Sequence, residues 1–300
     1  MFRLMRMNRL WAMGVVGMLL AGLATGAAAI SLDQIKDRGF IRIAVANEKP
    51  YGYIDDEGQA MGFGPETAKQ VLKELGITDI QWTVMPFGKL MDAVNSGRVD
   101  MVAAGQAILP ERCEQVLFSQ PNTSYGEGLL VLKGNPQKLR SFGNIAEDSE
   151  MKLGVVAGAS EAGFARDSGI ADEQLVELET AQDAIDALTE GRINAYAATQ
   201  FTVAGLAAES DAVEAAKPYA KKPFALNPFK DPIARHKLRS WGAFSFAQDS
   251  EELRDRFDEH LQDFQQTDAW FAILNEYGLD ERSIEAINKK TTEELCKMES

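Results

Sequence analysis

Short apolar stretches alternate along this chain with helical segments, and this alternation limits the fold more than any other feature. Residues 40–46 and 79–84 have the composition of strands, and a third strand is expected over residues 99–104. Between them, residues 64–75 and 88–95 place apolar side chains at helical spacing. This strand–helix–strand–helix–strand order predicts an α/β fold with a doubly wound parallel sheet.

Part of this pattern recurs later in the chain. The run Met91–Asp100 has a counterpart in Ile185–Asn194, where Asp, Ala, Gly and Arg stand in register and Ala-Ala follows each run at the same offset. Residues 41–46 and 153–157 are a second similar pair of segments. A solenoid needs more repeats than this, so the pattern favours two similar α/β lobes.

The chain is expected to pass between these lobes twice, first near residues 129–132 and then before a return strand over residues 242–246. The expected domains are a first lobe of residues 30–131 and 240–300 and a second lobe of residues 132–239. Two crossings form a hinge, and a hinge over a cleft can close on a ligand.

Two further segments complete the expected lobes. The helix after the return strand has apolar residues on one face, which are expected to be core: Leu253, Phe257, Leu261 and Phe264. Residues 221–237 contain three prolines and no clear period, so we expect an irregular surface insertion of the second lobe there.

The segment before residue 30 has the parts of a secretory signal peptide. Arg3, Arg6 and Arg9 precede an apolar run over residues 10–23, and small residues follow at 27–29. The alternative is a membrane anchor, but an anchor needs about 18 consecutive apolar residues, which is more than this run contains. We therefore expect export to the periplasm and a mature chain that is not embedded in a membrane.

The net charge of the chain limits the classes of partner that it can bind. The chain has 45 acidic and 31 basic residues, for a net charge of −14, and removal of the three signal-peptide arginines makes it more negative. Such a surface repels nucleic acids and anionic membranes, so neither is an expected partner. Most of these acids are interpreted simply as keeping an exported protein soluble.

The chain has two cysteines, Cys113 and Cys296. In an oxidising compartment an even pair suggests one disulfide, which would tie the C-terminal tail to a distant segment. Two distant cysteines are too few ligands for zinc, and His236 and His260 do not cluster with them in the sequence. No metal site is expected.

Candidate ligand-binding residues stand where the predicted strands end, because ligands of open α/β sheets bind beyond the carboxyl ends of strands. The third strand ends at Gly105 and leads to Arg112, whose guanidinium suits a carboxylate with two parallel hydrogen bonds. The alternative for Arg112 is a surface ion pair with Glu111 or Glu114.

Two other strand ends carry similar candidates. Ser160, in the turn that begins at Gly158, offers a hydroxyl and backbone N–H groups to the same carboxylate, although an ordinary helix cap is the alternative. Glu48 and Tyr51 suit a cationic group, and Phe87 suits an opposite wall. Tyr51 and Phe87 are alternatively core aromatics.

Motifs of catalysis are not found in this sequence. It has no Gly-x-Ser-x-Gly elbow, no phosphate-binding loop and no His and Glu residues at metal-binding spacing. We therefore expect a binding protein without a cofactor rather than an enzyme.

Several short motifs resemble the periplasmic solute-binding proteins of polar amino-acid ABC importers over nearly the whole mature chain. Their order and spacing are specific together, and they comprise Gly39–Val45, Ser96–Asp100, Leu109–Arg112 and Phe118–Pro121. Within the family, the chain is most similar to the members that bind ectoine and hydroxyectoine, on the segments Ala46–Pro50, Pro110–Cys113, Ser119–Pro121, Lys133–Pro136 and Thr292–Cys296. Both cysteines fall inside these motifs, which supports the disulfide.

The resemblance implies a two-lobed periplasmic binding protein fold of type II, in which each lobe is a doubly wound sheet flanked by helices. It also implies an ABC transporter permease as partner, a small zwitterionic ligand and a monomer. Arg112 would bind the ligand carboxylate, helped by Ser160 and the backbone near Gly158. Glu48 would pair with a protonated ring nitrogen.

The resemblance further implies an aromatic box around a cationic ring, with Tyr51 and Phe87 as two walls. The third wall falls at Ala107, so Tyr125 and Phe201 are the candidates to fill that space.

Amino-acid binders of the family hold the α-ammonium with a hydroxyl at the position of Ala107 and an Asp at the position of Thr199. Neither group is present here, so a cyclic or substituted zwitterion such as ectoine is expected to fit better than a plain α-amino acid. Three alternatives stay open. The protein binds a polar amino acid such as glutamine, glutamate or arginine; it is an enzyme similar to cyclohexadienyl dehydratase, with Glu48 as the acid; or it presents its ligand to a receptor.

Overall fold

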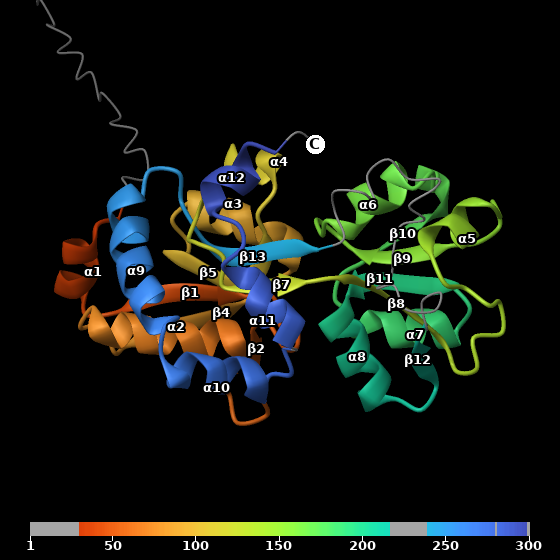
Figure 1. The fold of residues 1–300 in the computed structure, drawn as a ribbon, viewed down its shortest axis with the longest axis horizontal. Coiled ribbons are helices and arrows are strands. Elements are labelled where there is room, and N and C mark those ends of the chain that lie inside the picture. The colour runs from red at the N-terminus through yellow and green to blue at the C-terminus, as the bar shows by residue number, and fades with distance from the viewer. Residues whose placement is uncertain (1–29, 217–238, 280, 299–300) are drawn as a thin grey trace, which may run out of the picture.

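The computed structural model describes residues 30–216, 239–279 and 281–298, which form two α/β lobes beside each other (Figure 1). The first sheet consists of β1 (Ile41–Val45), β4 (Ile80–Val84), β5 (Met101–Ala107), β6 (Leu117–Phe118), β7 (Thr123–Tyr125) and β13 (Ser240–Phe246). The second sheet consists of β8 (Glu127–Leu132), β9 (Leu153–Val156), β10 (Leu175–Leu178), β11 (Ala195–Thr199) and β12 (Val213–Ala215). A small hairpin pairs β2 (Tyr53–Ile54) with β3 (Ala60–Met61).

Helices cover both sheets. Those of the first lobe are α1 (Leu32–Arg38), α2 (Phe63–Glu74), the 3-10 helix η1 (Phe87–Lys89), α3 (Leu90–Asn95), α4 (Pro110–Cys113), α9 (Glu251–Phe264), α10 (Asp268–Glu276), α11 (Glu281–Ile287) and α12 (Thr292–Cys296). Those of the second lobe are α5 (Phe142–Ala146), α6 (Glu161–Asp167), the 3-10 helix η2 (Asp172–Gln174), α7 (Asp183–Thr189) and α8 (Gln200–Glu209). The predicted two-lobed α/β fold is confirmed.

Both sheets are mixed rather than wholly parallel. In the order β4-β1-β5-β13-β6, β1 pairs parallel with β4 and β5, whereas β13 pairs antiparallel with β5. The second sheet, in the order β10-β9-β11-β8-β12, has the same division, because β8 runs antiparallel to β11. An antiparallel strand needs no crossover helix, so β8 and β13 can join the sheets directly as the chain changes lobes.

The core of the first lobe lies where α2 and α9 pack on the sheet. Val71 and Leu72 of α2 are completely buried there, together with Phe257 and Leu261 of α9. All seven residues of β5 are buried, as expected for a strand covered on both faces. The apolar spacing seen in the sequence is therefore the contact face of each helix.

The sequence repeat is also a repeat of hydrogen bonds. Residues 91–100 and 185–194 both end a helix, turn at a glycine with positive φ (Gly97 and Gly191) and enter a buried strand. The amide of Arg98 donates to the carbonyl of Ala93 at 3.0 Å, and that of Arg192 donates to Ala187 at 2.9 Å. The glycines are required because a left-handed residue ends each helix.

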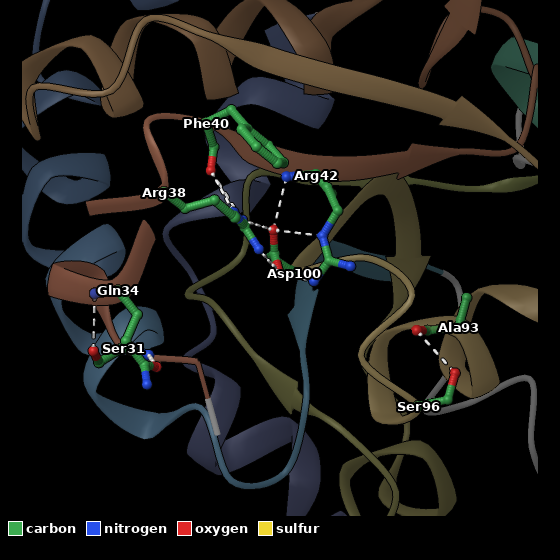
Figure 2. Close-up of polar contacts among 8 residues, drawn as sticks. All are labelled: Ser31, Gln34, Arg38, Phe40, Arg42, Ala93, Ser96 and Asp100. Carbon is green, nitrogen blue, oxygen red and sulfur yellow. Dashed lines mark hydrogen bonds and ion pairs between the residues drawn. The ribbon is translucent and has the colours of Figure 1, made fainter. Parts of the chain in front are cut away.

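The last residue of each repeat anchors the neighbouring strand. The carboxylate of Asp100 accepts from the amide of Arg42 at 2.7 Å, and the side-chain oxygen of Asn194 accepts from the amide of Lys152 at 2.7 Å. Asp100 is also paired with the guanidinium groups of Arg38 and Arg42 (Figure 2). These pairs lower the pKa of the Asp100 carboxyl although burial opposes them. The family motif at residues 96–100 is therefore structural.

The first crossing between the sheets lies a few residues before its predicted position. β7 ends at Tyr125 in the first sheet, and β8, which begins at Glu127, already pairs with the second sheet. The boundary predicted at residue 131 falls inside β8 because an apolar run does not reveal which sheet a strand joins.

The other lobe limits stay a prediction. The expected signal peptide and the insertion at 221–237 lie outside the described residues.

Candidate functional site

A cavity of about 30 Å³ lies between the two lobes, and residues of both lobes form its walls. That space holds about two water molecules, so the lobes are closed over it. The lining residues are Glu48, Tyr51, Phe87, Ala104, Gly105, Ala107, Arg112, Tyr125, Val156, Ala159, Ser160, Glu161, Tyr196, Ala197, Ala198 and Thr199. All the predicted ligand-binding residues except Gly158 are in this set. The structure therefore brings together side chains that the sequence placed at three separate strand ends.

Arg112 projects into the cavity from the short helix α4. It is 5% exposed, its Nη1 donates to the carbonyl of Ala107 at 3.2 Å, and its Nη2 donates to the carbonyl of Gly158 at 2.9 Å. Its guanidinium carbon lies 5.7 Å from the centre of the Phe87 ring. Burial lowers the pKa of Arg112. The alternative of a surface ion pair is wrong, because the side chain points into the cleft.

The disulfide lies directly beside Arg112. Cys113 bonds to Cys296, which joins α4 to α12 across a sequence separation of 183 residues, as predicted. α4 is a single turn and is too short to be stable by itself. The bond to α12 therefore helps to hold the helix that carries the guanidinium.

Glu48 lies across the cavity on the turn after β1. Its amide and carbonyl are both bonded to Gly52 at 3.0 Å, which closes that turn. Its Oε1 accepts from the hydroxyl of Thr202 at 2.7 Å. Burial raises the pKa of Glu48 to about 7, although the bond from Thr202 opposes this shift and the charge of Glu161 adds to it.

A chain of hydroxyl groups links the lobes at this point. The Tyr51 hydroxyl donates to Thr199 Oγ1 at 2.7 Å, and Thr199 Oγ1 lies 3.1 Å from Thr202 Oγ1. Because Thr202 uses its proton on Glu48, Thr199 donates to Thr202, and the chain runs in one direction from Tyr51 to the Glu48 carboxylate. Tyr51 and Glu48 belong to the first lobe, whereas both threonines belong to the second, so the chain joins the two lobes.

Aromatic rings surround the polar groups. Tyr51, Phe87, Tyr125 and Tyr196 all line the cavity. Tyr125 packs edge-on against Tyr51 with ring centres 5.5 Å apart, and its hydroxyl donates to the carbonyl of Gly105 at 3.2 Å. These walls suit an apolar or delocalised cationic ligand.

Of the two candidates for the wall at Ala107, Tyr125 lines the cavity and Phe201 packs in the cluster behind it. Gly105 has a φ of +59°, and a Cβ there would lie 2.4 Å from Tyr51 Cδ1. Gly105 therefore makes room for the Tyr51 ring.

Gly158 and Ser160 form the second-lobe side of the site. Gly158 does not line the cavity, but its carbonyl accepts from Arg112. The Ser160 side chain does not cap α6, so the cap interpretation is wrong, and its hydroxyl lies beside the cavity 3.5 Å from Glu161 Oε2.

Glu161 and Tyr196 were not predicted as site residues. Glu161 begins a helix, where an acidic residue is normally interpreted as an exposed partner of the helix dipole. In the structure it is 5% exposed and lines the cavity. Tyr196 lies inside the apolar strand β11 and has no local signal of a site. Within the described residues, no group of three or more His, Cys, Asp or Glu side chains is arranged to hold a metal ion.

Among the residues that the structure describes, no helix has the length and apolar character needed to cross a membrane.

Comparisons with known proteins give consistent results. The family model for bacterial extracellular solute-binding proteins, family 3, matches residues 41–280. The chain is 44% identical over 273 residues to a probable amino-acid ABC transporter periplasmic-binding protein, y4tE, of Sinorhizobium fredii. The matched region covers 90% of this chain and 87% of that protein. It is also 29% identical over 163 residues to the L-cystine-binding protein TcyJ of Escherichia coli. That match covers 53% of this chain and 59% of TcyJ.

Solved structures show the same likeness. EhuB in complex with hydroxyectoine has a TM-score of 0.78 and 28% identity, covering 89% of this chain and 98% of that one. The ancestral amino acid-binding protein AncCDT-1, a precursor of cyclohexadienyl dehydratase, has a TM-score of 0.68 and 22% identity, covering 82% and 98%. The second likeness is one of fold alone.

Proposed function

The chain belongs to family 3 of the bacterial extracellular solute-binding proteins, and from that premise we propose that it captures a small zwitterionic solute of the ectoine type between its lobes. Proteins of this family bind small ligands and work with ABC permeases, and this chain is the solute-binding component of an amino-acid-type ABC importer.

The observation that carries the proposal is that Arg112 and Glu48 both line one aromatic-walled cavity between the lobes. Arg112 holds the ligand carboxylate through two parallel hydrogen bonds and gives up its bonds to the carbonyls of Ala107 and Gly158. Glu48 accepts from the cationic end. Tyr51, Phe87 and Tyr125 supply ring faces to a delocalised cation.

The same arrangement disfavours an α-amino acid whose ammonium lies beside Thr199. Thr199 stands where a carboxylate would take the α-ammonium, and its hydroxyl is already bonded to Tyr51 and Thr202. A buried ammonium without a carboxylate partner is costly. The likeness to EhuB with hydroxyectoine supports the ectoine type, and the relative named as an amino-acid transporter protein supports a polar amino acid as the second candidate.

Transport follows from closure. In the proposal, residues before Ile30 direct export to the periplasm, the mature monomer closes on its ligand by hinge rotation, and the closed form docks on the permease. The cavity holds only about two waters, so the lobes must separate before a solute of this size can enter.

The test is a thermal-shift screen of the refolded mature protein followed by calorimetry. The panel contains ectoine, hydroxyectoine, proline betaine, glutamine, glutamate, histidine, arginine and cystine. A ligand that binds only the folded state raises the melting temperature. A shift with ectoine or hydroxyectoine supports the proposal. A shift with an amino acid alone supports the second candidate, and turnover of prephenate or arogenate would show an enzyme instead.

A further inference from the structure

Two acidic side chains on the second-lobe side of the cavity have no part in the scheme above. Glu161, the first residue of α6, is 5% exposed and lines the cavity. Glu127, the first residue of β8, has a buried Oε2 without a hydrogen-bond partner among the described residues. Burying two carboxyl groups next to each other is unfavourable, so this pair needs an explanation.

The sheet directs Glu127 towards the site. Glu127 is the antiparallel partner of Thr199, and directly opposed residues project from the same face of a sheet. Thr199 lines the cavity and bonds to Tyr51, so Glu127 stands next to the end of β11 that reaches the cavity. There the Glu127 carboxyl interacts with that of Glu161.

The two acids are coupled. Burial raises the pKa of both carboxyls, and for Glu127 the charge of Glu161 raises it further, to well above its usual value. The charge of Arg112 lowers the pKa of Glu161. Two adjacent buried carboxyls keep one proton between them. Of the two carboxyls, Glu161 is the one that lines the cavity.

The charges of the site are then unequal. Arg112 is one cation, whereas Glu48 and Glu161 are two acceptors for a cation. A ligand with one carboxylate and one nitrogen group satisfies Arg112 and only one of the two acids. The other acid would stay buried without a cationic partner on closure, which is unfavourable.

We propose that Glu161, backed by Glu127, is a second nitrogen-binding position, so that the ligand is a carboxylate with two separate N–H groups, one directed at Glu48 and one at Glu161. This inference rests on the proposed function and narrows its ligand class. A cyclic amidinium such as that of ectoine has two ring N–H groups, and a diamino monocarboxylate has two ammonium groups. A betaine has no N–H group and is excluded.

The test compares two matched pairs of probes by isothermal calorimetry on the mature protein. Ectoine is paired with proline, a cyclic zwitterion with one ring nitrogen, and ornithine with norvaline, which has the same carbon chain without the terminal nitrogen. We expect the two-nitrogen probe of at least one pair to bind about tenfold or more tightly than its partner, because a buried hydrogen bond to a charged group contributes on that scale. This comparison needs no variant.

Three variants then separate the roles of the two acids. Glu161→Gln should reduce the two-nitrogen preference to within about threefold. Glu127→Gln should preserve the preference, because the amide donates to Glu161 as the protonated acid does. Glu177→Gln, an exposed change on β10, is the matched control and should alter nothing. Thermal unfolding checks that each variant is folded.

The outcomes distinguish the inference from the proposed function. Tight binding of proline or norvaline that Glu161→Gln leaves unchanged overturns the inference and keeps the role as a solute-binding protein, with an amino acid as its ligand. Equal losses in Glu161→Gln and Glu127→Gln also overturn it, since they indicate a merely structural pair. If no probe here and no ligand of the wider panel binds, the proposed function fails, and the inference fails with it.

Discussion

Gly88 and Gly158 touch across the cleft with no side chain between them. A Cβ atom on Gly158 would lie 2.6 Å from the Cα of Gly88, and one on Gly88 would lie 2.9 Å from the carbonyl oxygen of Ala157. Real Cβ atoms do not approach so closely, so both residues must be glycine for the lobes to close fully. This contact also sets the distance at which the Gly158 carbonyl meets Arg112.

Gly158→Ala should therefore hinder closure. We expect affinity for the ligand found in the screen to fall about tenfold or more, because ligand binding must then work against a clash of order 1–3 kcal/mol. The measurement is calorimetry, together with small-angle scattering of the liganded form, which should stay more extended than the wild type.

Gly134→Ala is the control for this variant. Gly134 has the same φ of +79° but nothing within 4 Å of the added Cβ, so it carries the same backbone strain without a clash between lobes. Equal effects of the two alanines on affinity would refute the closure argument.

Arg112→Ala should nearly abolish binding while the protein stays folded. Removal of one partner from a buried charge pair costs about 3–5 kcal/mol, which is a loss of more than a hundredfold in affinity. Arg112→Lys should recover little, because an ammonium cannot make the two parallel bonds of a guanidinium. Arg166→Ala on the exposed side of α6 is the control. Unchanged affinity in Arg112→Ala would remove the proposed site.

Glu48 should make the stability of the ligand-free protein depend on pH. Its pKa is raised from 4.5 to about 7 on folding, so between those values the folded state holds more protons than the unfolded one. Stability from this group therefore falls as pH rises through that window, by about 3 kcal/mol in total.

Chemical denaturation of the wild type and Glu48→Gln from pH 5 to 8 measures this contribution. The wild type should lose stability relative to Glu48→Gln as the pH rises, and Glu177→Gln should follow the wild type. The affinity for a cationic ligand should change in the opposite direction and rise with pH through 7, since only the ionised Glu48 attracts the cation. Parallel curves for the wild type and Glu48→Gln would be inconsistent with this assignment.

The disulfide should contribute to stability and to ligand affinity together. Cys113→Ser combined with Cys296→Ser opens a loop spanning 183 residues, and the chain-entropy model gives a loss of about 5 kcal/mol in the free energy of unfolding. Because α4 carries Arg112 next to Cys113, we also expect weaker binding at temperatures where the variant is folded. Reduction should reproduce both effects in the wild type and have no effect on the double variant. If the double variant loses stability but keeps its ligand affinity, α4 holds Arg112 in place without the disulfide.

Local pattern was enough to predict most of the fold and part of the site. Apolar spacing located α2 and α9, and the repeated Gly-Arg turn revealed the second lobe, because both depend on neighbours in the chain. Arg112, Glu48 and Ser160 were found for a related reason. Each follows a strand, and α/β sheets gather their strand ends at one edge.

What the sequence by itself determined is the two-lobed architecture, the pairing of Cys113 with Cys296 and the polar groups at the strand ends. Only the tertiary structure decided how the lobes meet: the chain from Tyr51 to Glu48, the approach of Gly88 to Gly158, the place of Tyr125 beside Ala107, and the burial of Glu161 and Glu127. The physical reason is that these contacts join residues of different lobes or different strands. Their distances and burial depend on closure, which no local sequence pattern records.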